Sequence, residues 1–205
     1  MALARPTFLE ERTLIAAGFL NVAGVDEAGC GCLAGPVFAA AVILPLDSRL
    51  GLIRDSKLLS EGQRFRLAAD IKQRCASWAI GVATHQEIDE LNIRQAAALA
   101  MRRAVEALTI APDYILSDAF KIPGLTIPCK NIIHGDARIK SIAAASIIAK
   151  VERDKLMDEL DRSYPGYGFA VHKGYATKLH QKALMRLGPC EIHRKTYGPV
   201  KKFSL

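Results

Sequence analysis

The sequence predicts an α/β fold in which helices flank a β-sheet, and three observations support this prediction. Short apolar runs bounded by glycine and proline, at 21–26 and 36–44, indicate buried strands. Two long segments, 86–108 and 138–162, carry apolar residues at helical spacing and indicate amphipathic helices. Strands come first and then alternate with helices, which is the order expected when helices cover a sheet.

The other expected elements follow from local signals along the chain. We expect a short leader or a helix in residues 1–20. The segment Ser60-Glu-Gly-Gln63 has the form of a capping box, so a helix should cover 61–73. The remaining elements are expected to be strands at 77–84, 113–118 and 125–130 and a helix at 175–187.

Length and composition indicate one globular domain, residues 1–205, because half of the residues are hydrophobic. We divide it into a sheet-and-helix core, about 21–160, and a basic C-terminal region, about 161–205, expected to bind substrate. No apolar run is long enough to cross a membrane and no secretory signal is visible, so we expect a cytoplasmic protein without a membrane partner. Five irregularly spaced cysteines argue against a disulfide framework and a zinc site.

The net charge of +7 suits a polyanionic partner. Basic residues gather in the C-terminal third of the chain, and aromatic residues are interleaved with them. Basic side chains hold phosphates and aromatic faces stack on bases or sugars, so a nucleic acid fits this pattern. A solvated basic surface over core aromatic residues would give the same pattern for most of these residues taken individually.

Four carboxylates fall at or near the ends of predicted elements. Asp26 and Glu27 follow the first strand, Asp118 ends a later strand, and Asp136 precedes the long alanine-rich helix. If these acids converge, they repel one another, and two divalent ions would relieve the repulsion. Two divalent metal ions in one site stabilise the attacking and leaving oxygens of a phosphoryl displacement. Taken alone, the same acids could be solvated strand ends, and Asp136 a helix cap.

Several long motifs together resemble the type 2 ribonucleases H, the ribonuclease HII family. They run in family order from about residue 21 to 202 and comprise Val22–Val37, Asp55-Ser-Lys57, Ser117-Asp118, His134-Gly-Asp136, Ser141–Asp154, Tyr164–Phe169, His172–Lys178 and His193–Val200. The resemblance implies a ribonuclease H-like fold, which is a central mixed β-sheet flanked by helices with a helical C-terminal region. It also implies metal-dependent hydrolysis of the RNA strand of RNA/DNA hybrids.

The resemblance further implies nicking 5′ of a single ribonucleotide in duplex DNA, with 3′-hydroxyl and 5′-phosphate products and a role in ribonucleotide removal. Asp26, Glu27, Asp118 and Asp136 match the family's catalytic acids, and two Mg²⁺ or Mn²⁺ ions are the expected cofactors, with Asp26 bridging them. The expected partners are RNA/DNA hybrids and ribonucleotide-containing duplex DNA. A monomer is expected because no heptad seam is visible.

The family reads the 2′-hydroxyl with a Gly-Arg-Gly turn, which is Gly29-Cys30-Gly31 here, and with a tyrosine that Tyr175 matches. Recognition of the 2′-hydroxyl by backbone groups would not be affected by this change. A thiol, however, cannot supply the charge and the hydrogen-bond donors of arginine. We therefore expect weaker substrate binding or relaxed junction specificity beside an intact metal site. The alternative is a catalytically weakened hybrid-binding protein, which the retention of all four acids argues against.

Lys57 and Lys173 are candidate phosphate contacts, although each could be a plain surface lysine. Ser146 and Lys150 lie one turn apart on the long predicted helix and are expected to support the site rather than to react. A type 3 ribonuclease H is disfavoured because it usually carries an N-terminal substrate-binding domain, for which the residues before Asp26 leave no room. Another nuclease or recombinase of the same fold would lack the His-Lys-Gly-Tyr segment found here.

Overall fold

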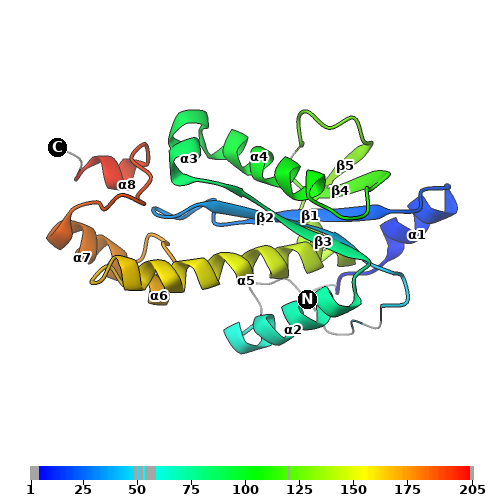
Figure 1. Ribbon diagram of the computed structural model, residues 1–205, viewed down its shortest axis with the longest axis horizontal. Coiled ribbons are helices and arrows are strands. Elements are labelled where there is room, and N and C mark those ends of the chain that lie inside the picture. Colours follow the sequence, from blue (N-terminus) through cyan, green and yellow to red (C-terminus); the bar gives the residue numbers. More distant parts are fainter. Residues whose placement is uncertain (1–4, 49, 51–52, 54–58, 120, 204–205) are drawn as a thin grey trace.

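A mixed five-stranded sheet forms the centre of the molecule, and its strands lie in the order β3-β2-β1-β4-β5 (Figure 1). The computed structural model describes residues 5–48, 50, 53, 59–119 and 121–203. The strands are β1 (Val22–Ala28), β2 (Val37–Ile43), β3 (Ser77–Ala83), β4 (Tyr114–Asp118) and β5 (Cys129–Ile132). Because β1 pairs antiparallel with β2 and parallel with β4, the ends of β1 and β4 lie side by side.

Helices cover both faces of this sheet, which confirms the predicted α/β class. The long helices α4 (Ile93–Glu106) and α5 (Lys140–Ser163) lie on opposite faces, as Figure 1 shows. Strand β2 is buried on both sides, because Ala39 and Ala41 pack in the cluster that contains α4 while Ala40 and Val42 pack in the cluster that contains α5. The other helices are α1 (Leu9–Ala16), α2 (Glu61–Arg74), α3 (His85–Leu91), η2 (Gly135–Ala137), α6 (Phe169–His172), α7 (Lys178–Leu187) and α8 (Gly198–Lys201).

The single helix expected over 86–108 is wrong, because the chain forms two helices there, α3 and α4. They meet at Asn92, whose backbone has a φ of +72°. Asparagine tolerates this conformation better than most residues, and its side chain accepts hydrogen bonds from Arg94 N and Gln95 N. A new helix, α4, therefore begins after Asn92 and runs in its own direction across the sheet.

The helix expected to begin at Tyr175 begins instead at Lys178. Thr177 is its N-cap, and the Thr177 hydroxyl accepts a hydrogen bond from His180 N. Tyr175 therefore precedes the helix. The predicted strand at 125–130 is β5, shifted toward the C-terminus, and the short helices α6 and α8 were not predicted. Among the described residues, no helix has the length and apolar character needed to cross a bilayer.

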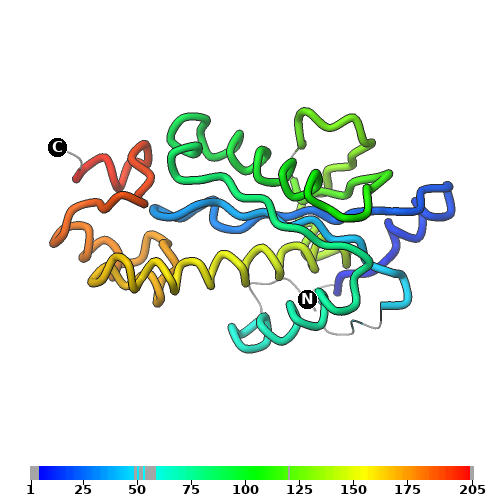
Figure 2. The backbone as a smooth tube through the Cα atoms, in the orientation of Figure 1, coloured from blue at the N-terminus to red at the C-terminus, as the bar shows by residue number. Residues whose placement is uncertain are grey.

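The C-terminal segment lies against the loop that joins β1 to β2. Backbone hydrogen bonds connect Leu33 N to Gly174 O at 2.8 Å, Arg194 N to Leu33 O at 2.9 Å and Gly35 N to Ile192 O at 2.9 Å. Figure 2 shows this segment, in orange and red, folded back beside the end of the blue strands. Residues far apart in the sequence thus meet at the end of β1.

Strand β1 approaches α5 so closely at Gly24 that no side chain would fit between them. A Cβ atom on Gly24 would lie 2.2 Å from the carbonyl carbon of Ser141, at the start of α5. Side chains alternate along a strand, so Asp26 faces the same helix two residues later. This close approach brings the carboxylate of Asp26 toward the side chains of α5.

Replacement of Gly24 by alanine tests this packing. We expect Gly24→Ala to lower the free energy of unfolding by about 3 kcal/mol, because neither the backbone of α5 nor β1 can move aside. Urea denaturation measures the change. The control is Gly62→Ala, because a Cβ on Gly62 of α2 meets no atom within 4 Å; that variant should be more stable by about 0.5 kcal/mol. Equal stability of the two variants would contradict the account.

Candidate active site

Three carboxylates meet where β1, β4 and η2 come together. Asp26 lies on β1, Asp118 is the last residue of β4, and Asp136 lies in η2 directly after β5. One carboxylate oxygen from each residue lies within 4.8 Å of the other two. Asp26 and Asp136 are almost completely buried, each 4% exposed. The parallel pairing of β1 with β4 brings residues that are distant in sequence into this cluster.

Hydrogen bonds hold these carboxylates in place. Asp118 Oδ1 accepts from Gly135 N at 2.9 Å, and Asp26 Oδ1 accepts from Glu27 N at 2.8 Å. A hydrogen bond with Ser146 of α5 lowers the pKa of Asp26, although it does not overcome the burial of that carboxyl. The side chains are thus oriented before any ligand arrives, which reduces the cost of binding one.

The electrostatics of the cluster are unfavourable without a cation. Burial raises the pKa of Asp26 well above its usual value, and the charges of Glu27 and Asp118 raise it further. Burial and the charge of Asp118 also raise the pKa of Glu27. A carboxyl whose pKa is raised in the folded state costs stability as the pH rises through that pKa. At neutral pH a bound cation would offset this cost.

Glu27 borders the cluster but is not one of the three closely spaced carboxylates. Its Oε1 accepts a hydrogen bond from Cys30 Sγ at 3.6 Å. Its Oε2 is buried and has no hydrogen-bond partner among the described residues, a situation that is costly for a carboxylate. The available donors are hard carboxylate oxygens, which suit Mg²⁺ or Mn²⁺. The residues present therefore fit a divalent metal centre.

A cavity of about 230 Å³ opens over the acids. Its lining includes the residues that the sequence analysis singled out, namely the four acids, the Gly29-Cys30-Gly31 turn and Tyr175. Ser146 and Lys150 of α5, expected only as supporting residues, also line it, as does Arg64 of α2. Lys173 is not part of the lining, and Lys57 lies outside the described residues.

The carbonyl groups of the Gly29-Cys30-Gly31 turn are held by Arg194, which is fully buried. Arg194 donates from Nη2 to Gly29 O at 2.7 Å and from Nη1 to Cys30 O at 2.9 Å. Tyr197 OH donates to Cys30 O as well, at 2.9 Å. The C=O and N–H of one peptide unit point in opposite directions, so the N–H groups of Cys30 and Gly31 face away from Arg194.

A second buried arginine, Arg153 of α5, holds the later part of the loop between β1 and β2. It donates to Pro36 O, Ala34 O and Lys173 O at 2.9–3.2 Å. Gly29 has a φ of +100°, and a Cβ there would lie 2.1 Å from Arg153 Nε. A Cβ on Gly31 would meet no atom within 4 Å. Packing therefore demands glycine at Gly29, whereas Gly31 faces open space.

Tyr175 reaches the cavity through a backbone bridge with Cys32 rather than from a helix. The Lys150 ammonium lies 5.2 Å from the centre of the Tyr175 ring. Burial is the main cause that raises the pKa of Tyr175 to about 12, so its hydroxyl remains protonated at neutral pH. Tyr175 is 38% exposed and combines a hydrogen-bond donor with a ring face at the edge of the cavity.

Of the two lysines predicted to contact phosphate, Lys173 lies among the described residues, and it does not line the cavity. The Lys173 ammonium pairs with Asp158 and lies 3.7 Å from Glu61 Oε1. Its backbone carbonyl accepts a hydrogen bond from Arg153. The Lys173 side chain is only 12% exposed, so it is not a plain surface lysine, and its contact with phosphate stays a prediction. Lys150 does line the cavity, and it also pairs with Asp154 at 2.7 Å.

Comparisons with known proteins agree with this geometry. The sequence model of the family described as ribonuclease HII matches residues 23–200. A ribonuclease HII of Desulfitobacterium hafniense is 53% identical over 193 residues, which are 94% of this chain and 74% of that protein. A ribonuclease HII of Nitrosococcus oceani is 50% identical over 183 residues, or 89% of this chain and 91% of that protein.

Solved structures of ribonucleases H share the fold of this chain. The crystal structure of the ribonuclease H2 from Pyrococcus horikoshii has a TM-score of 0.75 and 26% identity, and the match covers 90% of this chain and 97% of that one. The ribonuclease HII of Archaeoglobus fulgidus, solved in a complex with PCNA, has a TM-score of 0.69 and 27% identity over 87% of this chain and 95% of that one. The chain therefore belongs to the ribonuclease HII family, endoribonucleases that hydrolyse the RNA strand of RNA/DNA hybrids with the help of divalent metal ions.

Proposed function

We propose that this enzyme nicks duplex DNA on the 5′ side of a single ribonucleotide, in addition to hydrolysing RNA in hybrids, and that it serves ribonucleotide removal. The products would carry 3′-hydroxyl and 5′-phosphate ends. The observation that supports this most directly is that the acid cluster shares its cavity with the Gly29-Cys30-Gly31 turn and Tyr175. Cleavage and recognition of one sugar can therefore occur in the same small space.

In this proposal Asp26, Glu27, Asp118 and Asp136 hold two Mg²⁺ or Mn²⁺ ions. The ions supply the positive charge that stabilises the attacking and leaving oxygens of the phosphodiester. Asp26 would be the best candidate to bridge them, because its carboxyl is buried and the charges of both Glu27 and Asp118 act on it and raise its pKa. Gly135 N and Ser146 keep the carboxylates oriented while the substrate enters.

Ribose would be distinguished from deoxyribose by donors that need a 2′-oxygen. The N–H groups of Cys30 and Gly31 face away from Arg194, and the protonated hydroxyl of Tyr175 lines the same cavity. A single turn of this size can contact one sugar, so one ribonucleotide in a DNA strand would be sufficient. The exposed ring face of Tyr175 would stack on the neighbouring deoxyribose.

We further propose a monomer with one catalytic domain, in which the basic region from about residue 161 onward binds the duplex. The net charge of +7 supports a nucleic acid partner. The alternative of a weakened hybrid-binding protein finds less support. The Cys30 thiol stays neutral because burial and the Glu27 charge raise its pKa, and it donates its hydrogen bond to Glu27, which lies outside the group of three aspartates.

An Asp118→Asn variant tests the metal centre. The amide oxygen can still accept from Gly135 N, so the fold should persist. Relief of the repulsion should raise the unfolding temperature in EDTA, while Mg²⁺ should no longer stabilise the protein. Cleavage should fall by more than about 100-fold, since a metal ligand is lost. Calorimetry with and without Mg²⁺ measures the first effect, and an equal Mg²⁺ shift in both proteins would contradict the assignment.

The two glycines of the turn should respond differently to alanine. Gly29→Ala should unfold more readily by about 3 kcal/mol, because its Cβ collides with Arg153. Gly31→Ala should keep the wild-type unfolding temperature but lose cleavage at a single ribonucleotide, because the new methyl group occupies space meant for the sugar. Thermal unfolding and cleavage are measured on both variants. Wild-type cleavage by Gly31→Ala would show that this turn does not approach the ribose.

Replacement of Cys30 by arginine restores the residue type that is typical of the family. We expect Cys30→Arg to raise kcat/KM by about 10-fold through a charge-assisted contact with phosphate. Cys30→Ala is the matched control, because it removes the hydrogen bond to Glu27 without adding charge. Steady-state kinetics on a duplex with one ribonucleotide and on a hybrid measure both effects. Unchanged efficiency and unchanged ribose discrimination in Cys30→Arg would refute the expectation.

A further inference from the structure

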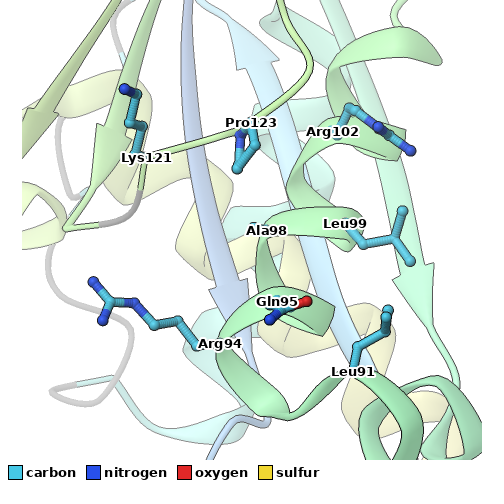
Figure 3. Close-up of a pocket in the computed structure, with 8 residues that line it drawn as sticks. All are labelled: Leu91, Arg94, Gln95, Ala98, Leu99, Arg102, Lys121 and Pro123. Carbon is cyan, nitrogen blue, oxygen red and sulfur yellow. The ribbon is translucent and has the colours of Figure 1, made fainter.

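A second cavity, of about 440 Å³, lies on the face of the molecule covered by α4. Figure 3 shows that its side chains come from α4, from Leu91 at the end of α3, and from the loop that follows β4. We call it the α4 pocket and define it by Arg94, Leu99, Arg102, Lys121 and Pro123. None of these residues takes part in the acid cluster.

The α4 pocket carries positive charge from three side chains, and no acid lines it. The guanidinium of exposed Arg94 makes no ion pair or hydrogen bond with the part of the chain that the structure describes. Arg102 Nε is buried without a hydrogen bond and forms an ion pair with Glu106, one turn away, at 3.6 Å. Such cations are suited to a polyanion whose phosphates they can contact.

The floor of the α4 pocket is apolar. Leu99 and Pro123, both labelled in Figure 3, line it together with the charged groups. A free inorganic anion would leave this surface unused, whereas a nucleic acid strand presents sugar carbons beside each phosphate. The combination of charged rim and apolar floor therefore favours a sugar-phosphate backbone.

The position of the α4 pocket connects it to the proposed reaction. Lys121 follows Asp118 by three residues, so the two Cα atoms are at most about 11 Å apart. Phosphates in one strand rise about 3.4 Å each along the duplex axis. Lys121 therefore lies within a distance of Asp118 that equals the rise of about three nucleotides.

We infer that the α4 pocket binds backbone phosphates of the nucleic acid strand that flanks the cleavage site. This inference rests on the proposed function and extends the contact surface beyond the ribose-reading turn. Arg94 and Lys121 hold phosphates, and Leu99 and Pro123 pack against deoxyribose. The pocket contributes to affinity and to the register of the duplex, and it does not touch the reacting phosphate.

The test is the salt dependence of duplex binding by an Arg94→Gln/Lys121→Gln double variant. Binding is measured by fluorescence anisotropy in EDTA, so that no cleavage occurs, on a DNA duplex with one ribonucleotide. Loss of two phosphate contacts should reduce the slope of log Kd against log salt by about 1.8. The control, Arg12→Gln/Arg74→Gln, removes the same charge from exposed positions on α1 and α2 and should keep the wild-type slope.

A second measurement identifies the strand. The duplex is shortened stepwise on either side of the ribonucleotide, and the difference between wild type and the double variant should vanish when one particular side is removed. A difference that persists at every length, or equal slopes for the pocket variant and the control, would overturn the inference. Arg94→Glu, a single exposed change, should weaken binding further in the same assay, and unchanged binding would also overturn it.

Cleavage by the wild-type protein in Mg²⁺, measured on the same duplex, separates the two proposals. An absence of cleavage would refute the proposed function, while the slopes would still report on the α4 pocket. Cleavage with equal slopes would refute the pocket inference alone. The double variant should show a raised KM in the same reaction, because the α4 pocket acts on binding.

Discussion

The mutual repulsion of buried carboxylates is the interaction on which this structure depends. Asp26, Asp118 and Asp136 each offer an oxygen within 4.8 Å of the others, and the pKa of Asp26 is raised by its neighbours as well as by burial. A fold can tolerate such a cluster only if the surrounding elements hold it together, as the parallel pairing of β1 with β4 and the contact of β1 with α5 do here. Because this repulsion between the carboxylates is unfavourable, the cluster favours the binding of divalent cations.

The loop between β1 and β2, which carries the turn proposed to read ribose, is held by two buried arginines from distant parts of the chain. Arg153 belongs to α5, Arg194 follows α7, and both donate to carbonyl groups of the loop between β1 and β2. Charged donors bound to neutral carbonyls in a dry interior fix the loop firmly. The turn beside the acids is therefore a rigid part of the core, although it is a loop. The turn is thus held through its backbone carbonyl groups and not through the side chain of Cys30.

The sequence sufficed for features that depend on local pattern or on long motifs. Apolar runs revealed β1 and β2, the capping box at Ser60 located α2, and the motifs identified the acids that meet in the cavity. The break at Asn92 was missed because the apolar spacing continues through it. Tyr175 was wrongly assigned to a helix, because the helix begins only after its N-cap residue, Thr177. The roles of Arg153 and Arg194 could not be foreseen, because their partners lie more than a hundred residues away.

The most direct test of the account is the cleavage of a DNA duplex that carries one ribonucleotide, with Mg²⁺, Mn²⁺ or EDTA, beside an Asp136→Asn control. The account predicts a single nick 5′ of the ribonucleotide, which requires a divalent ion and is lost in the control. Asp136 is buried in the acid cluster, and asparagine keeps its shape while removing its charge, so the control variant should still bind the duplex. Tight binding without a nick in Mg²⁺ or Mn²⁺ would contradict the account.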